Sequence, residues 1–361
     1  MAGTMSVRGL RAPTADGHQA AILSRRADFC TILLGQWLML GLAIDGWAHH
    51  TQPGVDSFFT PWHGVLYSGY GACAAWMIWL IVQQRRAGFI GRAAIPRGYG
   101  PGLAGVLIFG FAGIGDLIWH ETIGIEQNRK ASLSPTHLLL FLGIVLIVSS
   151  PFRAAWAAED PAEDAPSLGR FLPALLSLSG AASIVGAMLI WLWGLAYLRD
   201  GHAATALISP AALAATQDLD FAMVLITTVL LLAPLLLALL RWRPPFGSAM
   251  ILFGIVAGLL CAVTGFRQPI DVVVAVVAGL LADLGIWRYA PGPARPAAFR
   301  SLAMGVPIVL WLGHFLATAL SGGIAWPPEY WTGISLLAGL VGLGLSVLLV
   351  PPTLPPRIAH R

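Results

Sequence analysis

The chain contains 361 residues, of which 57% are hydrophobic and only 11% are charged, whereas charged residues make up about 25% of an ordinary soluble domain. This composition is typical of an integral membrane protein, and it excludes a cytosolic enzyme and a disordered chain. The formal net charge of +4 depends on where the basic residues lie relative to the membrane, so it does not indicate a nucleic-acid partner. The three cysteines all lie in apolar stretches and provide neither a disulfide framework nor a Cys-x-x-Cys zinc site.

Ten stretches of the chain are long and apolar enough to cross a bilayer as helices, which takes about 20 residues each. Clusters of proline and glycine separate these stretches, as expected at the ends of helices. The sequence therefore predicts an all-α, polytopic membrane protein with about ten transmembrane helices. We place them at residues 28–49, 61–84, 102–123, 134–152, 171–198, 219–240, 246–265, 270–288, 300–321 and 331–350.

The basic residues indicate the orientation. Of the 21 lysine and arginine residues, 17 fall in the two terminal segments and in the connections that follow the even-numbered helices. By the positive-inside rule this side is cytoplasmic, so both termini are predicted to be cytoplasmic. An acidic connection separates a half with four helices from a half with six. The expected units are a tail (1–27), a four-helix half (28–155), an acidic linker (156–170), a six-helix half (171–351) and a tail (352–361).

Polar residues of the first four predicted helices form a pattern that occurs twice. In each copy an aspartate and a histidine four residues apart share one face of a helix near its outer end. A Pro-x-His sequence then opens the next helix, and the proline places the second histidine one turn inside it. The two sets are Asp45, His49 and His63, and Asp116, His120 and His137.

One aspartate and two histidines make a set of metal ligands. Three such ligands with an open coordination position suit catalytic zinc, non-haem iron or copper. The structural alternative is that these groups pair with each other and with interfacial water. Because ionisable groups at membrane depth are costly unless they are paired or bind a ligand, and because the pattern is repeated, we favour metal binding.

The first set resembles a motif in the C subunit of the copper membrane monooxygenases, the particulate methane and ammonia monooxygenase family. In that subunit Asp-x3-His precedes Phe-Thr-Pro-x-His and a helix that contains tyrosine. This chain has Asp45, His49, the sequence Phe-Thr-Pro-Trp-His at 59–63, and then Tyr67.

The second motif of that family is Asn-x3-His, then an acidic residue, then Pro-x-His. Here Asp116 takes the place of the asparagine and is followed by His120, Glu126 and His137. The resemblance covers about residues 41–140 and implies two neighbouring copper sites. These would be formed by Asp45, His49 and His63, and by Asp116, His120 and His137.

Other residues near the two motifs are candidates for supporting roles. Glu126 is a candidate catalytic residue as a proton carrier, and the alternative is a solvated loop acid. Nearby aromatic residues form either the wall of a dry pocket or an interfacial belt: Trp47, Phe58, Phe59, Trp62 and Trp119. Further candidates for contact with the ligands or the pocket are His50, Tyr67 and Glu121. In the six-helix half, His314 is expected to form a hydrogen bond to a neighbouring helix.

The resemblance implies a copper cofactor, and the ligand types leave zinc or non-haem iron as alternatives. The orientation predicted from the basic residues places the site near the extracytoplasmic face of the cell membrane. The expected activity is oxidation of a small apolar or lipophilic substrate with dioxygen. Two alternatives are a zinc-dependent membrane hydrolase and a non-catalytic copper-binding or transport subunit. The expected partners are the lipid bilayer, the substrate, and other membrane subunits or further copies of this chain, with no nucleic acid.

Overall fold

The computed structural model describes residues 22–51, 58–124, 134–158, 166–193, 210–263, 265–266, 269–321, 324 and 326–352, with side chains for all of these except 49–51, 190–193 and 210–220. Within these ranges the chain is helical and forms no β-strand. The helices are α1 (Arg25–Thr51), α2 (Pro61–Arg86), the short 3-10 helix η1 (Gly91–Ala94), α3 (Gly100–Thr122), α4 (Pro135–Val148), α5 (Ser150–Trp156), α6 (Leu168–Trp193), α7 (Pro210–Arg241), α8 (Ser248–Val263), α9 (Pro269–Tyr289), α10 (Pro296–Ser321) and α11 (Pro328–Leu349).

The lengths and apolar composition of these helices confirm a polytopic membrane protein. Among the described residues, eight helices are long and apolar enough to cross a membrane, and the bent pair α4–α5 makes a ninth if it is one span. The short apolar helix α8 has 16 residues. Each of the ten predicted segments coincides with one helix or with the bent pair. Ten spans were predicted and eight single helices in the described part of the chain meet the criterion, because α8 is short and α4–α5 is bent.

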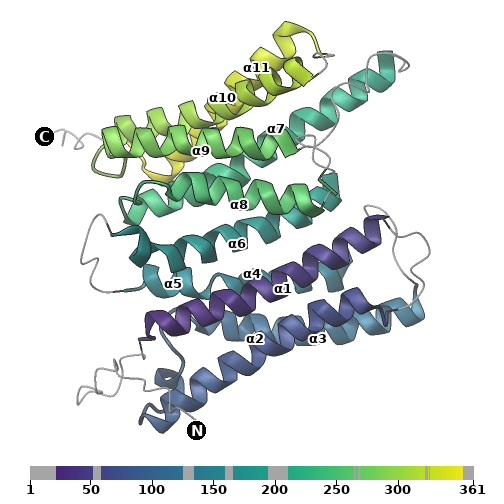
Figure 1. The fold of residues 1–361 in the computed structure, drawn as a ribbon, viewed down its shortest axis with the longest axis vertical. Coiled ribbons are helices and arrows are strands. Elements are labelled where there is room, and N and C mark those ends of the chain that lie inside the picture. Colours follow the sequence, from purple (N-terminus) through teal and green to yellow (C-terminus); the bar gives the residue numbers. More distant parts are fainter. Residues whose placement is uncertain are drawn as a thin grey trace, which may run out of the picture.

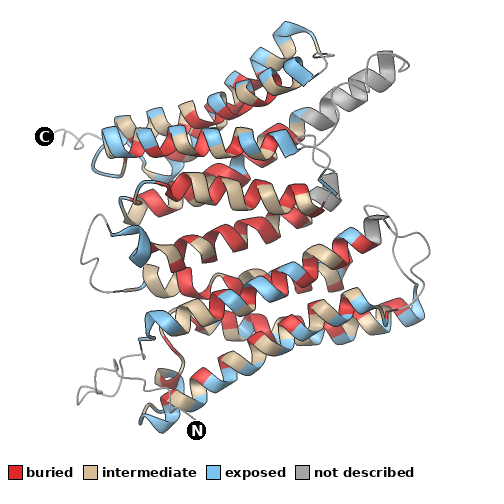
Figure 2. Cartoon of the chain, viewed as in Figure 1, coloured by how far each residue is buried: buried red, intermediate tan, exposed pale blue. Residues whose placement is uncertain are grey.

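The helices lie side by side in one bundle (Figure 1). The hairpins α1–α2 and α3–α4 form one edge, α6 and α8 lie in the middle, and α7 and α9–α11 form the other edge. Helix α6 packs against α1 and α4 as well as against α7 and α8. It is also the most enclosed, since 72% of its apolar stretch is buried compared with 28–39% for α1, α2 and α3 (Figure 2). Thus α6 joins the two halves.

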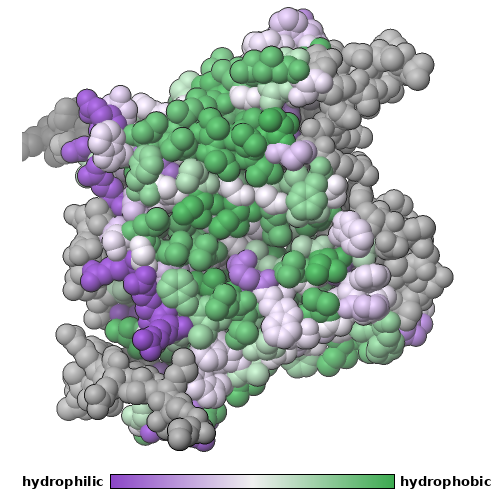
Figure 3. Space-filling model, in the orientation of Figure 1, coloured by the Kyte–Doolittle hydropathy of each residue, from purple (hydrophilic) through white to green (hydrophobic). Residues whose placement is uncertain are grey.

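Helix α3 shows which faces meet lipid. Its outer face carries four large, exposed apolar side chains spaced three or four residues apart: Leu107, Phe111, Ile114 and Ile118. Its opposite face is buried and holds Asp116 and His120. A helix with apolar side chains outside and carboxylate and imidazole inside is arranged for lipid surroundings, where polar groups must find partners within the protein. The space-filling view shows the same preference across the bundle, with hydrophobic side chains over much of the visible face (Figure 3).

Glycines let the two helices of each N-terminal hairpin approach closely. A Cβ on Gly41 would lie 2.6 Å from Cα of Leu66, and one on Gly69 would lie 2.7 Å from Cα of Leu38. In the second hairpin, Gly105 and Gly143 face each other, because a Cβ on either would lie within 2.9 Å of the other's carbonyl oxygen. Small residues at helix contacts are a common means of packing in membranes. These contacts fix how the four helices present their polar ends.

The bend between α4 and α5 is 47° and occurs just before Pro151, which lies in the first turn of α5. Proline lacks the N–H that would continue the helix and its ring disturbs the preceding turn. Ser177 of α6 satisfies backbone groups at the break: its hydroxyl donates to the carbonyl of Val148 (2.7 Å) and accepts from the N–H of Phe152 (3.0 Å). The bend is therefore stabilised by the central helix.

Two buried polar contacts hold the six-helix half together. The carboxylate of Asp283 in α9 accepts the backbone N–H groups of Ala249 and Met250, both at 3.0 Å, and so caps the N-terminus of α8 from a neighbouring helix. The ring of His314 in α10 donates from Nδ1 to Oδ1 of Asp271 in α9, at 2.7 Å. This contact confirms the predicted hydrogen bond between His314 and a neighbouring helix.

Candidate metal centre

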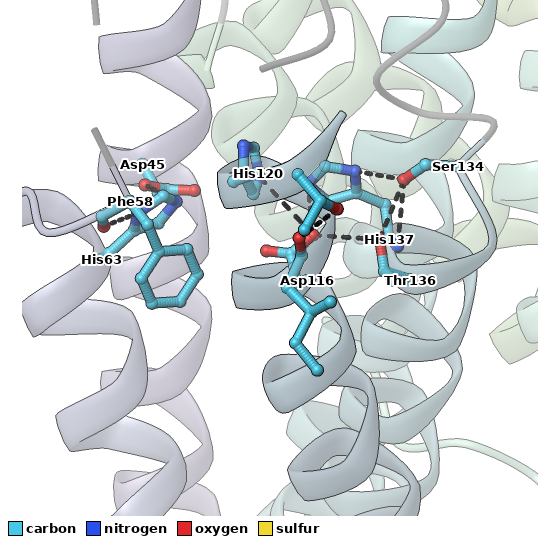
Figure 4. Close-up of polar contacts among 10 residues, drawn as sticks. Asp45, Phe58, His63, Asp116, His120, Ser134, Thr136 and His137 are labelled. Atoms are coloured by element: carbon cyan, nitrogen blue, oxygen red, sulfur yellow. Dashed lines mark hydrogen bonds and ion pairs between the residues drawn. The ribbon is translucent and has the colours of Figure 1, made fainter. Parts of the chain in front are cut away.

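The repeated polar pattern comes together at one end of the two N-terminal hairpins (Figure 4). Asp45 lies in the last turns of α1 and His63 in the first turn of α2; Asp116 and His120 end α3, and His137 begins α4. The first four of these are buried, and the side chain of His137 is 22% exposed. Because α1 and α3 end where α2 and α4 begin, each hairpin tip carries its own aspartate and histidine.

Hydroxyl side chains fix the start of α2 and α4. Thr60 Oγ1 accepts the backbone N–H of His63 at 3.2 Å, and Ser134 Oγ accepts that of His137 at 3.3 Å. A proline follows each of these caps, and its fixed φ suits the first helical position. Each histidine is therefore the third residue of its helix, which confirms the depth predicted from the Pro-x-His motif.

Asp116 is the common neighbour of two imidazoles. Its Oδ1 lies 3.5 Å from Nε2 of His120 and 3.6 Å from Nε2 of His137. Both separations are longer than an N–H···O hydrogen bond of about 2.7–3.2 Å. Metal–ligand distances of about 2.0–2.2 Å in tetrahedral geometry place two ligand atoms about 3.4 Å apart. The donor types and their spacing, with one ligand atom from each residue within 4.8 Å of the others, therefore fit a metal ion.

A chain of hydroxyl groups determines which nitrogen of His137 is available. Thr136 donates its only hydroxyl proton to Oδ1 of Asp116 (2.9 Å), so the hydroxyl of Ser134, 3.1 Å away, donates to Thr136. Ser134 Oγ must then accept from Nδ1 of His137, which lies at 2.6 Å. With the proton of the neutral ring on Nδ1, its Nε2 lone pair points toward Asp116. This is the tautomer and orientation that a metal-binding histidine needs.

Asp45 and His63 form a second carboxylate–imidazole pair. Nδ1 of His63 lies 2.5 Å from the backbone carbonyl oxygen of Phe58, which only accepts, so Nδ1 carries a proton. Its Nε2 faces Oδ1 of Asp45 at 3.3 Å. An unprotonated Nε2 and a carboxylate repel each other unless a cation lies between them. The pair is therefore complementary to a positive charge, supplied either by a metal ion or by a proton on Nε2.

The two groups are neighbours across the hairpins. The rings of His63 and His120 have centroids 6.2 Å apart, and those of His120 and His137 are 6.0 Å apart. The Phe58 ring contacts both sides, at 4.9 Å from His63 and 5.9 Å from His120. In Figure 4 this ring lies between the Asp45–His63 pair and Asp116. The structure thus brings together five of the six predicted ligands.

The sixth predicted ligand, His49, lies in α1, but its side chain is outside the described residues, as is that of His50. Glu126, the predicted proton carrier, also falls outside the described ranges. Glu121 is exposed. The roles of these residues stay predictions.

The aromatic candidates differ in their surroundings. Phe58 is buried against the histidines, whereas Trp47 and Phe59 are exposed. Trp62 and Trp119 are half-buried, and the indole Nε1 of Trp119 is buried without a hydrogen-bond partner among the described residues. Tyr67 packs against Phe58 and His63, with ring centroids 5.6 and 6.3 Å away. Phe58 of the predicted aromatic wall, and Tyr67 among the further candidates, thus have rings close to the histidines.

Sequence reasoning missed two supporting residues, Ser134 and Thr136. Both belong to the Ser-Pro-Thr-His sequence that opens α4, and a serine before proline at a helix start is a recognisable cap signal. Its second contact, to the imidazole three residues later, could also have been inferred from the cap position. The contact between Thr136 and Asp116 could not, because it joins helices 20 residues apart in the chain.

We predict that Ser134→Ala weakens metal binding about 10–100-fold, the usual effect of removing the group that orients a ligand. The variant removes the acceptor of Nδ1 of His137 and the cap of α4. A competition titration against a chelator measures the affinity. Thr60→Ala is the matched control, because it removes the same kind of cap while His63 keeps its contact with the Phe58 carbonyl. Equal losses in both variants would mean that Ser134 acts through the cap alone.

No protein-family model, no curated protein and no solved structure matches the chain. The similarity to the copper membrane monooxygenases therefore stays a prediction from the two motifs within residues 41–140.

Proposed function

We propose that the chain is a membrane oxidoreductase with a copper centre at the extracytoplasmic ends of its first four helices. Its substrate is a small apolar or lipophilic molecule that is oxidised with dioxygen, as in the copper membrane monooxygenases that the two motifs resemble. The observation that carries the proposal is the placement of two imidazole Nε2 atoms 3.5 and 3.6 Å from the same oxygen of a buried aspartate.

The donor set supports this choice of metal. Imidazole suits copper, zinc and iron, and divalent copper binds most tightly among the first-row metals at a given site. Asp116, His120 and His137 would hold the ion, and Asp45 and His63 supply a second complementary pair beside it. Bound copper supplies one-electron redox chemistry and activation of dioxygen. The carboxylates offset the charge of a cation that would otherwise be costly among buried helices.

The other residues of the site have structural tasks in this proposal. Ser134 and Thr136 orient His137 and Asp116, and the buried Phe58 ring excludes water between the hairpins. The outer face of α3 is apolar directly behind Asp116 and His120. This supports a lipophilic substrate that arrives through the bilayer. Electrons come from a donor outside this chain, such as another membrane subunit of an assembly or a small reductant.

The metal content of the detergent-purified, full-length protein tests the proposal. We expect near-stoichiometric copper in the wild type, and its loss in His120→Ala/His137→Ala. His314→Ala is the matched control, since it removes a buried histidine from the other half and should keep the copper. Reductant-dependent consumption of dioxygen with a lipophilic substrate, abolished by a copper chelator, completes the test.

Two outcomes would overturn the proposal. Zinc in place of copper, with ester or amide hydrolysis that needs no reductant, would identify a hydrolase. A well-folded wild type that takes up no metal after reloading would leave the aspartates and histidines as structural groups.

A further inference from the structure

The hydroxyl of Tyr67 is a buried polar group that has no role in the proposed metal centre. Its oxygen is buried and has no hydrogen-bond partner among the described residues. A buried donor without a partner lowers stability, so each such group in a native protein needs an explanation. Tyr70, on the same helix, provides the contrast: its hydroxyl donates to the backbone carbonyl of Val106 at 2.9 Å, and its ring stacks on Phe109.

The position of Tyr67 relates it to both hairpins. It follows His63 by four residues, so the two side chains share one face of α2. From there the phenol reaches α3 at Gly113, where an added Cβ would lie 3.1 Å from the hydroxyl oxygen and 2.8 Å from the ring. Only a residue without a side chain leaves room for the phenol at this point. The hydroxyl thus lies against the buried face of α3.

Gly113 is three residues before Asp116, on the same face of α3. Side chains of a helix lean toward its N-terminus, so the Asp116 carboxylate extends toward the turn that contains Gly113. Tyr67 therefore brings its hydroxyl to the level of that carboxylate. The rings around it are Phe58 at 5.6 Å, Phe109 at 5.7 Å and His63 at 6.3 Å, and the hydroxyl forms no hydrogen bond to any of them. An acceptor for this hydroxyl is thus expected from a molecule that enters the site.

We propose that Tyr67 donates a hydrogen bond to a small external ligand at the open coordination position of the Asp116, His120 and His137 centre. The ligand class is a small molecule or anion with an oxygen or nitrogen acceptor, such as water, azide or an oxygen species of similar size. This inference rests on the proposed function, because it needs a metal ion at these three residues. It identifies Tyr67 as the residue that positions the external ligand, on the side of α2.

Azide binding to the copper(II)-loaded, full-length protein in detergent tests the inference. Absorption and electron paramagnetic resonance spectra follow a titration of wild type, Tyr67→Phe and Tyr70→Phe. Tyr67→Phe removes one oxygen atom and should weaken azide binding about tenfold, which equals about 1.4 kcal/mol. Tyr70→Phe should bind azide as the wild type does, because its hydroxyl is engaged with Val106.

Thermal melting of the metal-free proteins provides a second readout. Tyr67→Phe removes an unsatisfied hydroxyl and should melt at or above the wild-type temperature, whereas Tyr70→Phe loses a hydrogen bond and should melt lower. Equal azide affinity in wild type and Tyr67→Phe, with copper bound, would overturn this inference alone. Failure of the wild type to bind copper would overturn the proposed function and this inference with it.

Discussion

Replacing Asp116 by alanine is expected to abolish metal binding at the candidate centre, with an affinity at least roughly 100-fold below that of the wild type. Residues that only orient a ligand already account for about 10–100-fold. Asp116 does more, because its Oδ1 faces both imidazoles and accepts the hydroxyl of Thr136. Without the carboxylate, His120 and His137 lose the negative charge between them, and Thr136 loses its acceptor.

A chelator competition and the metal content of the purified protein measure the effect of Asp116→Ala. Glu329→Ala is the control, since it removes an exposed carboxylate from the first turn of α11 in the other half and should bind metal normally. Asp116→Asn should give an intermediate affinity, because the amide oxygen can still accept from Thr136 but carries no charge. A normal affinity for metal in Asp116→Ala would show that the metal binds elsewhere in the protein.

Replacing Gly69 by alanine is expected to lower the free energy of unfolding by about 1–3 kcal/mol, the usual cost of an extra methyl group in a tightly packed interior. The new Cβ would lie 2.7–3.1 Å from three backbone atoms of Trp37 and Leu38 in α1. Backbone atoms of a helix cannot move aside alone, so α1 and α2 must separate. The separation would also move Asp45 away from His63.

Gly71→Ala is the control for this prediction, because a Cβ at Gly71 meets nothing within 4 Å. Alanine is favoured over glycine inside a helix by about 0.5–1 kcal/mol, so Gly71→Ala should be neutral or stabilising. In the same detergent, Gly69→Ala should therefore lower the melting temperature, whereas Gly71→Ala should leave it unchanged or raise it. A Gly69→Ala protein as stable as Gly71→Ala would contradict the close approach of α1 and α2.

The membrane character and most helix positions could be predicted from local sequence features. Apolar stretches bounded by proline and glycine predicted each helix that the structure describes as long and apolar. Two details were not predicted. Pro151 bends α4–α5 instead of only bounding a helix, because Ser177 of a distant helix satisfies the broken backbone. Helix α8 is short, and Asp283 of α9 caps its start.

Part of the candidate centre could also be predicted from local sequence features. Residues four apart share a helix face, so Asp116 and His120 were paired correctly, and the caps place His63 and His137 at the third position of their helices. The contact of Asp45 with His63 within one hairpin follows from the shared hairpin tip. The role of Thr136 does not follow, since it depends on how α4 is rotated toward α3.

The sequence by itself determined that the chain is a helical membrane protein and that each of two hairpins carries an aspartate and a histidine at its tip. Hydropathy and helical periodicity act over a few residues, so they can be recognised in a single segment. Only the tertiary structure decided that one oxygen of Asp116 is shared by two imidazoles, that His63 and His120 are neighbours across the hairpins, and that Tyr67 reaches α3. These contacts depend on the distance and rotation of packed helices, which are set by close approaches such as those of Gly69 and Gly113, between residues far apart in the chain.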